Sequence, residues 1–164
     1  MIVQDRASIA LKVTLVGSLA AVGAALVSQY AFHMPPCAWC VLQRLIFLVI
    51  AAVSAFALWS RRPGFRGALA GIILLLAGSG IASATYQHFV AAHSISCRAS
   101  LAERIVSETL HLDALLPVVF EIRVACGAGT ATMLGIPYEL WSLAAFGLLA
   151  ATLAWSSVPR RRSR

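Results

Sequence analysis

The sequence predicts an all-α membrane protein, a bundle of four transmembrane helices with both termini in the cytoplasm. Three observations support this prediction. Of the 164 residues, 60% are hydrophobic and only 12% are charged, about half the charged share of roughly 25% in globular proteins. Four apolar runs are each about 20 residues long, enough to cross roughly 30 Å of hydrocarbon as helices. Most of the basic residues gather beside the ends of these runs.

The four spans are expected within a single membrane domain that covers residues 1–164. They lie at about residues 9–30, 41–59, 67–89 and 138–158. For the first span a cleaved signal peptide is the alternative, because signal peptides also combine a charged start with an apolar stretch. The Pro63-Gly64 pair predicts a turn between the second and third spans. In the third span, Gly71 and Gly78 either allow close helix packing or are ordinary glycines of a membrane helix.

The distribution of basic residues predicts the orientation of the spans. Nine of the 13 Lys and Arg residues form three groups beside the apolar runs: Arg6 and Lys12; Arg61, Arg62 and Arg66; and Arg160, Arg161, Arg162 and Arg164. Short flanking segments rich in Lys and Arg stay in the cytoplasm. Since an even number of spans puts both termini on one side, all three groups fall on the cytoplasmic side. Once these flanks are assigned, the net charge of +7 no longer indicates nucleic-acid binding.

Two segments, at about residues 31–40 and 90–137, then face the opposite compartment. All four cysteines lie in these outer segments: Cys37, Cys40, Cys97 and Cys126. This distribution is typical of thiol–disulfide chemistry in an oxidising compartment such as the bacterial periplasm. A bridge between Cys97 and Cys126 would close a loop of about 30 residues and contribute roughly 3–4 kcal/mol. A purely structural disulfide is therefore an alternative for this pair.

The longer outer segment contains one predicted amphipathic helix. The run Ser100-Leu101-Ala102-Glu103 matches a capping box, which predicts that a helix starts there. Five apolar residues are expected to form a stripe along the helix: Leu101, Ile105, Leu112, Leu115 and Leu116. Pro117 is expected to end it. Such a helix either lies in the membrane interface or packs on another protein surface.

The chemistry is predicted at residues 35–44, where the first outer segment meets the second span. Pro35 and Pro36 favour a helix that begins just after them. Cys37 and Cys40 then occupy the first turns, where the positive end of the helix dipole stabilises a thiolate. Arg44, four residues after Cys40, shares its helix face and raises the thiolate fraction further. An arginine that snorkels to the interface is the alternative interpretation of Arg44.

Haem and zinc are weaker interpretations of the cysteines. Attachment of c-type haem needs a histidine directly after the CxxC motif, and Val41 occupies that position. A zinc site usually needs a second, closely spaced pair of ligands, whereas Cys97 and Cys126 are far apart in the sequence. No metal is therefore expected.

The Cys-x-x-Cys-x-x-Gln-Arg run at residues 37–44, the four-span layout and the distant pair of loop cysteines resemble the DsbB family of disulfide-bond formation proteins. Residues 134–141 also resemble the start of the last span in that family. The vitamin K epoxide reductase-like proteins share a related four-helix design. However, they carry their membrane CxxC near the last span, whereas it lies just before the second span here.

The resemblance implies a membrane thiol oxidase of the bacterial inner membrane. It would reoxidise a periplasmic thioredoxin-fold oxidase similar to DsbA and pass the electrons to a membrane quinone, either ubiquinone or menaquinone. Cys97 would form the mixed disulfide with the partner, and Cys126 would pass the electrons to the first outer segment. Residues 127–132 have smaller and less distinctive side chains than expected for the family, so the resemblance does not extend to the details of how the partner docks.

The resemblance also implies roles around the quinone. Cys37 and Cys40 would form the dithiol next to it, with the Cys40 thiolate facing the ring. Arg44 would bind and polarise the quinone, and His88 would match a family histidine near it. Two other functions stay open on the sequence alone. One is a small membrane protein with structural disulfides, such as a transporter subunit or an assembly factor. The other is a membrane reductase that runs electrons outward, since CxxC chemistry proceeds in either direction.

Overall fold

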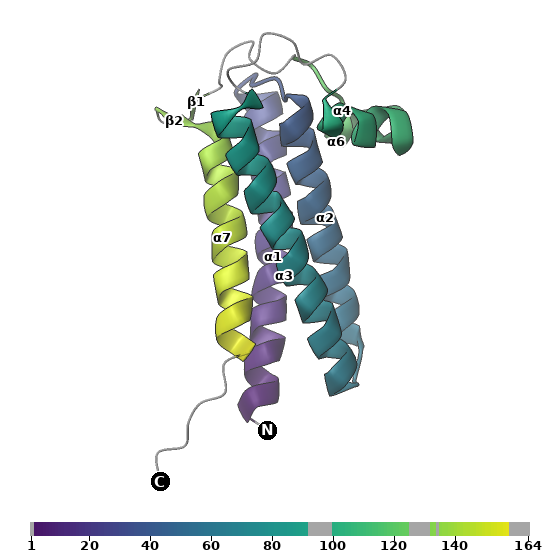
Figure 1. Ribbon diagram of the computed structural model, residues 1–164, viewed down its shortest axis with the longest axis vertical. Helices are drawn as coiled ribbons and strands as arrows, with labels where there is room; N and C mark the ends of the chain where they lie inside the picture. The colour runs from purple at the N-terminus through teal and green to yellow at the C-terminus, as the bar shows by residue number, and fades with distance from the viewer. Residues whose placement is uncertain (1, 92–99, 125–131, 134, 158–164) are drawn as a thin grey trace.

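Four long helices form the body of the computed structural model, which describes residues 2–91, 100–124, 132–133 and 135–157. The helices are α1 (Ile2–Ala31), α2 (Ala38–Trp59), α3 (Pro63–Phe89) and α7 (Tyr138–Ser157). They lie side by side along the long axis of the molecule (Figure 1). The main contacts join α1 to α2, α2 to α3, α3 to α7 and α7 to α1, so the four helices form a closed ring.

All four helices are long and apolar enough to cross a membrane. Their outward surfaces carry large apolar side chains, among them Val16, Leu75 and Leu148, because lipid and not water is the solvent around them. These helices confirm the predicted all-α, four-span class. The first helix begins at Ile2, before the expected span, since polar residues can continue a helix beyond the hydrocarbon. Which side of the membrane each terminus faces stays a prediction.

Aromatic packing joins α2, α3 and α7 in the middle of the bundle. Phe47 of α2 stacks on Phe146 of α7, with ring centroids 3.9 Å apart and ring planes 1° from parallel. Gly80 of α3 lies against the same ring, and a Cβ added there would be 2.5 Å from a ring carbon of Phe146. A Cβ added at Gly71 or Gly78 would meet nothing within 4 Å. Close packing of α3 therefore depends on Gly80, and the close-packing interpretation of Gly71 and Gly78 was wrong.

The described part of the outer segment from residue 100 onward starts with a helix whose first residues were predicted correctly. The Ser100 Oγ accepts a hydrogen bond from the backbone N–H of Glu103 at 3.2 Å, which caps α4 (Leu101–Glu103). The chain then widens into the π-helix η2 (Arg104–Thr109). At His111 the backbone adopts a left-handed conformation with φ of 48°, which ends the helix before the expected position. Two more single turns follow, α5 (Leu112–Leu115) and α6 (Pro117–Phe120).

The predicted apolar stripe of this segment is confirmed only in part. Leu101 and Leu115 are exposed, whereas Ile105 and Leu112 pack against the buried cluster at the start of α2, which includes the fully buried Ala102 and Val106. The prediction assumed one continuous α-helix, but the π-helical turns and the break at His111 change which residues share a face. The helical turn α5 ends at Leu115, just before Pro117, and Pro117 then begins α6, in keeping with the preference of proline for the first helical turn.

The outer helices pack on the end of the bundle where α2 begins (Figure 1). A second buried cluster, separate from the core of the bundle, joins them to α2. Its members are Ala38, Trp39, Val41, Leu42, Ala91, Ala102, Val106 and Phe120. A short antiparallel hairpin of β1 (Thr132–Met133) and β2 (Ile136–Pro137) precedes α7. The CxxC motif therefore lies where the end of the bundle and the outer helices meet.

Candidate functional site

The CxxC motif begins helix α2. Cys37 has an extended backbone (φ −87°, ψ 169°) and is the N-cap residue, so the helix starts at Ala38, just after the two prolines. Cys40 lies in the first turn, which closes with a hydrogen bond from the Val41 N–H to the Cys37 carbonyl at 3.1 Å. The two Sγ atoms are 3.1 Å apart, in hydrogen-bond contact. This separation exceeds the roughly 2.05 Å of a disulfide bond, so the two cysteines do not form a disulfide with each other.

A side chain from α3 contacts both sulfurs. The Gln87 Nε2 donates to the Cys40 Sγ at 3.3 Å and to the Cys37 Sγ at 3.5 Å. The Oε1 of Gln87 accepts a hydrogen bond from the Nε2 of Gln43 at 2.8 Å. No motif in the sequence singles out Gln87. A signal for it existed, because an uncharged polar side chain near the end of an apolar helix needs a partner.

Arg44 is buried and does not snorkel to the interface, so that alternative was wrong. Only 4% of its surface is exposed. Its Nη1 donates to the Gln29 Oε1 at 2.6 Å and to the Val119 carbonyl at 3.0 Å, and its Nη2 donates to the Ala25 carbonyl at 3.4 Å. One guanidinium therefore joins α2 to α1 and to the outer helix α6. Within the described residues, its Nε has no hydrogen-bond partner.

A cavity of about 260 Å³ lies between α1, α2 and α7. Cys40 and Arg44 both line it, and the aromatic side chains of Phe47, Tyr138 and Trp141 form much of the rest of its wall. Small residues of α1 complete the wall on the opposite side, and the lining is mostly apolar. The cavity is therefore lined by one thiol and one cation, in a space that a flat apolar molecule can occupy.

His88 is one residue from Gln87 but has a different partner. Its Nδ1 is 2.9 Å from the Glu139 Oε1 at the start of α7, and about a third of its side chain is exposed. His88 is not among the described residues that line the cavity. The predicted role of His88 near a quinone stays a prediction.

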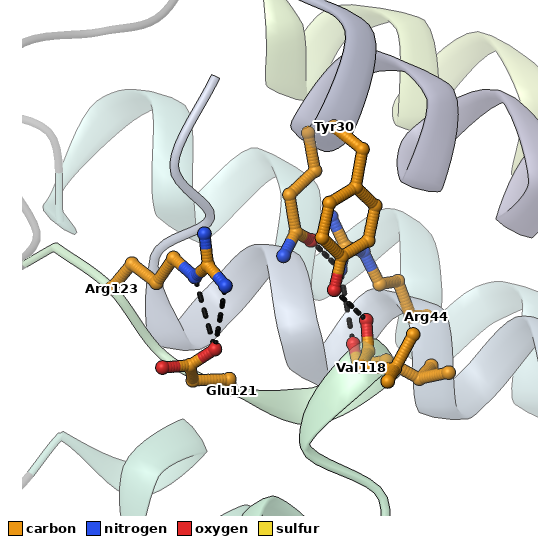
Figure 2. A network of polar contacts seen from close by, with 7 residues as sticks. Tyr30, Arg44, Val118, Glu121 and Arg123 are labelled. Atoms are coloured by element: carbon orange, nitrogen blue, oxygen red, sulfur yellow. Dashed lines mark hydrogen bonds and ion pairs between the residues drawn. The ribbon is translucent and has the colours of Figure 1, made fainter. Parts of the chain in front are cut away.

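The outer segment is attached to the helix ends beside the dithiol. The Tyr30 hydroxyl donates to the Val118 carbonyl at 2.8 Å, and Figure 2 shows this contact next to that of Arg44 with the same turn. The Arg123 guanidinium contacts the Glu121 carboxylate, which raises the pKa of Arg123 above its usual value, and it lies 5.8 Å from the centre of the Tyr30 ring.

A backbone pairing brings the end of this segment to the CxxC motif itself. The Arg123 N–H donates to the Pro36 carbonyl at 3.1 Å, and Val124 forms a parallel bridge with Cys37. The other two predicted redox residues, Cys97 and Cys126, lie outside the described residues. Their pairing and their role therefore stay predictions.

Four membrane helices with a CxxC dithiol at one end and a buried arginine one turn further define the class of membrane thiol–disulfide oxidoreductases. Comparison with known proteins agrees with this assignment. The family model described as "Disulfide bond formation protein DsbB" matches residues 7–156. The chain therefore belongs to the DsbB family and is a multi-pass membrane protein of disulfide bond formation.

Individual relatives carry the same description. The disulfide bond formation protein B of Cupriavidus metallidurans is 35% identical over 88% of this chain and 89% of its own length. Disulfide bond formation protein B 1 of Pseudomonas syringae pv. syringae is 34% identical, over 88% of this chain and 85% of its own length. Disulfide bond formation protein B 2 of Burkholderia lata is 32% identical, over 85% and 82%. The similarity thus extends over nearly the whole of each protein.

Proposed function

We propose that this protein is a dithiol:quinone oxidoreductase that reoxidises a DsbA-like, thioredoxin-fold oxidase in the periplasm. Electrons would pass from the partner to Cys97 and Cys126, then to Cys37 and Cys40, and finally to a membrane quinone. The observation that carries the proposal is that Cys40 and Arg44 line one apolar cavity at the end of the membrane bundle.

The residues of the cavity fit a quinone. Apolar and aromatic walls suit a flat ring, and a quinone carbonyl oxygen needs a hydrogen-bond donor in such surroundings. Arg44 provides one, because its buried Nε has no partner within the described part of the chain. The rest of the guanidinium is fixed by Gln29 and Val119, so the donor is held in place before a ligand binds. Ubiquinone and menaquinone both present such carbonyl oxygens.

The dithiol supplies the electrons. When Cys37 and Cys40 form a disulfide, the S–S bond replaces two S–H bonds and releases two electrons and two protons. A quinone held in this cavity would accept both electrons and both protons and so become the quinol. Arg44 holds the acceptor oxygen beside Cys40 and stabilises negative charge near it. Burial of the arginine and partial burial of Cys40 limit the access of bulk water to the exchange.

Exchange between the two cysteine pairs completes the proposed route. A thiolate of the partner would attack the Cys97–Cys126 disulfide and leave this pair reduced. In a second exchange, the Cys37–Cys40 disulfide would be reduced while the Cys97–Cys126 disulfide forms again. The pairing of Val124 with Cys37 supports this second exchange, because Cys126 follows Val124 by only two residues in the sequence. An inner-membrane location with the cysteines on the periplasmic side belongs to the same proposal.

The test is the thiol state of the reconstituted protein with and without quinone. Liposomes would contain the wild-type protein, reduced thioredoxin-fold partner and either ubiquinone, menaquinone or no quinone, and free thiols would be counted by maleimide mass labelling. The proposal expects all four cysteines to become reduced without quinone and to return to disulfides when quinone is added. A protein with structural disulfides alone would show no dependence on quinone, and this result would refute the proposal.

A further inference from the structure

The proposed function uses Cys40 and Arg44 but leaves the contact from α3 unexplained. Gln87 is 92% buried and Gln43 is 98% buried, since their exposed fractions are 8% and 2%. The two side chains form one chain of hydrogen bonds. The Nε2 of Gln43 donates to the Oε1 of Gln87, and the Nε2 of Gln87 donates to the sulfurs of Cys37 and Cys40. Burying two amides in a membrane helix bundle is costly unless they are bonded in this way.

The contact chain sets which end of the Gln87 amide meets the sulfurs. A carboxamide has a carbonyl oxygen that accepts and an NH₂ group that donates. Because Gln43 donates to the Oε1, the NH₂ group of Gln87 is turned toward Cys37 and Cys40. A neutral thiol can donate or accept, whereas a thiolate only accepts. An NH₂ group at this position therefore favours the thiolate over the thiol.

We propose that Gln87 is a positioning residue that stabilises the thiolate of the dithiol, and that Gln43 orients it by holding its carbonyl oxygen. The thiolate is the nucleophile in disulfide exchange, so the contact raises the reactivity of the pair near neutral pH. It also favours the reduced form over the disulfide, because a disulfide sulfur is a weaker acceptor than a thiolate. The inference rests on the proposed function in one respect only, namely that this thiolate takes part in the proposed electron transfer.

Other titratable groups surround the dithiol and stay unchanged in the test. These are Arg44 on α2, Tyr138 on α7, Tyr30 on α1 and the His88–Glu139 pair between α3 and α7. Arg44 acts on the sulfurs by its charge. Gln87 is neutral and acts by direct donation, so replacing it changes the contact without removing a charge. A change in the pH profile can then be assigned to the contact itself.

The experiment measures the alkylation of Cys40 by iodoacetamide from pH 5 to pH 10 in the reduced, detergent-purified protein, with mass spectrometry to identify the modified cysteine. Gln87→Leu removes the donor, and Gln87→Glu keeps the size but replaces the donor by an acceptor. Gln43→Leu removes only the group that orients Gln87. Ser83→Ala is the matched control, because Ser83 is buried one turn earlier on α3 and bonds its own helix at the Gly80 carbonyl.

The expected result is an alkylation rate at pH 7 about tenfold lower in Gln87→Leu, with the midpoint of the profile about one pH unit higher. Gln87→Glu moves the midpoint at least as far, Gln43→Leu moves it less, and Ser83→Ala leaves it in place. Gln87→Met, which is uncharged and close to glutamine in size, decides the question if Gln87→Leu does not fold. A profile unchanged in the folded Gln87 variants would overturn the inference. This outcome is independent of quinone turnover in the wild-type protein, on which the proposed function depends.

Discussion

Replacing Arg44 with lysine separates the charge of this residue from its geometry. The guanidinium donates to Gln29 and Ala25 on α1 and to Val119 on α6, and still has its Nε available. A lysine keeps the positive charge, but its single ammonium group cannot hold both elements and also supply a fixed donor to the cavity. We therefore expect Arg44→Lys to weaken the binding of quinone while the electrostatic effect on Cys40 is kept.

The size of the effect follows from the contact that is lost. A hydrogen bond to a charged group contributes about 1.5–3 kcal/mol, which corresponds to a decrease in kcat/KM for quinone of roughly 10- to 100-fold. Most of this decrease should be a higher KM in Arg44→Lys, since a binding contact is lost. In Arg44→Met the charge is lost as well, so kcat should also fall.

The assay is steady-state quinone reduction at several quinone concentrations, followed by the loss of quinone absorbance with reduced partner in excess. Arg123→Lys is the matched control, because Arg123 is a half-exposed arginine that bonds Glu121 away from the cavity. It should leave the KM for quinone within about twofold of the wild type. A wild-type KM in Arg44→Lys, or an equal rise in Arg123→Lys, would show that Arg44 does not bind the acceptor.

Two further substitutions test the packing of the bundle and the attachment of the outer segment. Gly80→Ala should lower the free energy of unfolding by about 1–3 kcal/mol, because the Cβ of the new alanine collides with the Phe146 ring. Gly78→Ala should have little effect, and thermal unfolding of both variants in detergent measures the difference. Tyr30→Phe removes the hydrogen bond to the Val118 carbonyl and should increase amide hydrogen exchange at residues 117–124. The same variant should slow turnover with the protein partner more than turnover with a small dithiol, and equal slowing would contradict a role in loop attachment.

The fold was predictable because membrane-spanning helices are determined by hydropathy and charge, which can be read directly from consecutive residues of the sequence. Four apolar runs of membrane length identified the four helices, and the two prolines before Cys37 identified the start of α2. The outer segment was predicted less well. Its capping serine is a local signal, and Ser100 does cap α4. The π-helical turns and the left-handed backbone of His111 interrupt the α-helix, and an assumed helical periodicity cannot anticipate them.

The site was predictable only where its residues share one helix. Cys37 is the N-cap residue of α2, and Cys40 and Arg44 lie on this helix, so their spacing was enough to group them. Gln87 reaches the sulfurs from α3, and no spacing within one helix indicates which face of a neighbouring helix will meet it. Its neighbour His88 was singled out by resemblance, yet it points to Glu139. A difference of one residue along a helix is about 100° around its axis, which decides the partner.

The proposed electron relay is tested most directly by measuring quinone reduction by the detergent-purified protein with a reduced thioredoxin-fold dithiol partner. Cys40→Ser and Cys97→Ser would be assayed beside the wild type. The relay predicts turnover in the wild type with ubiquinone or menaquinone and none in either variant, because each cysteine pair carries out a required step. No turnover of the wild type with several partners and both quinones, while Cys97 and Cys126 stay bridged, would contradict the relay and favour a structural disulfide.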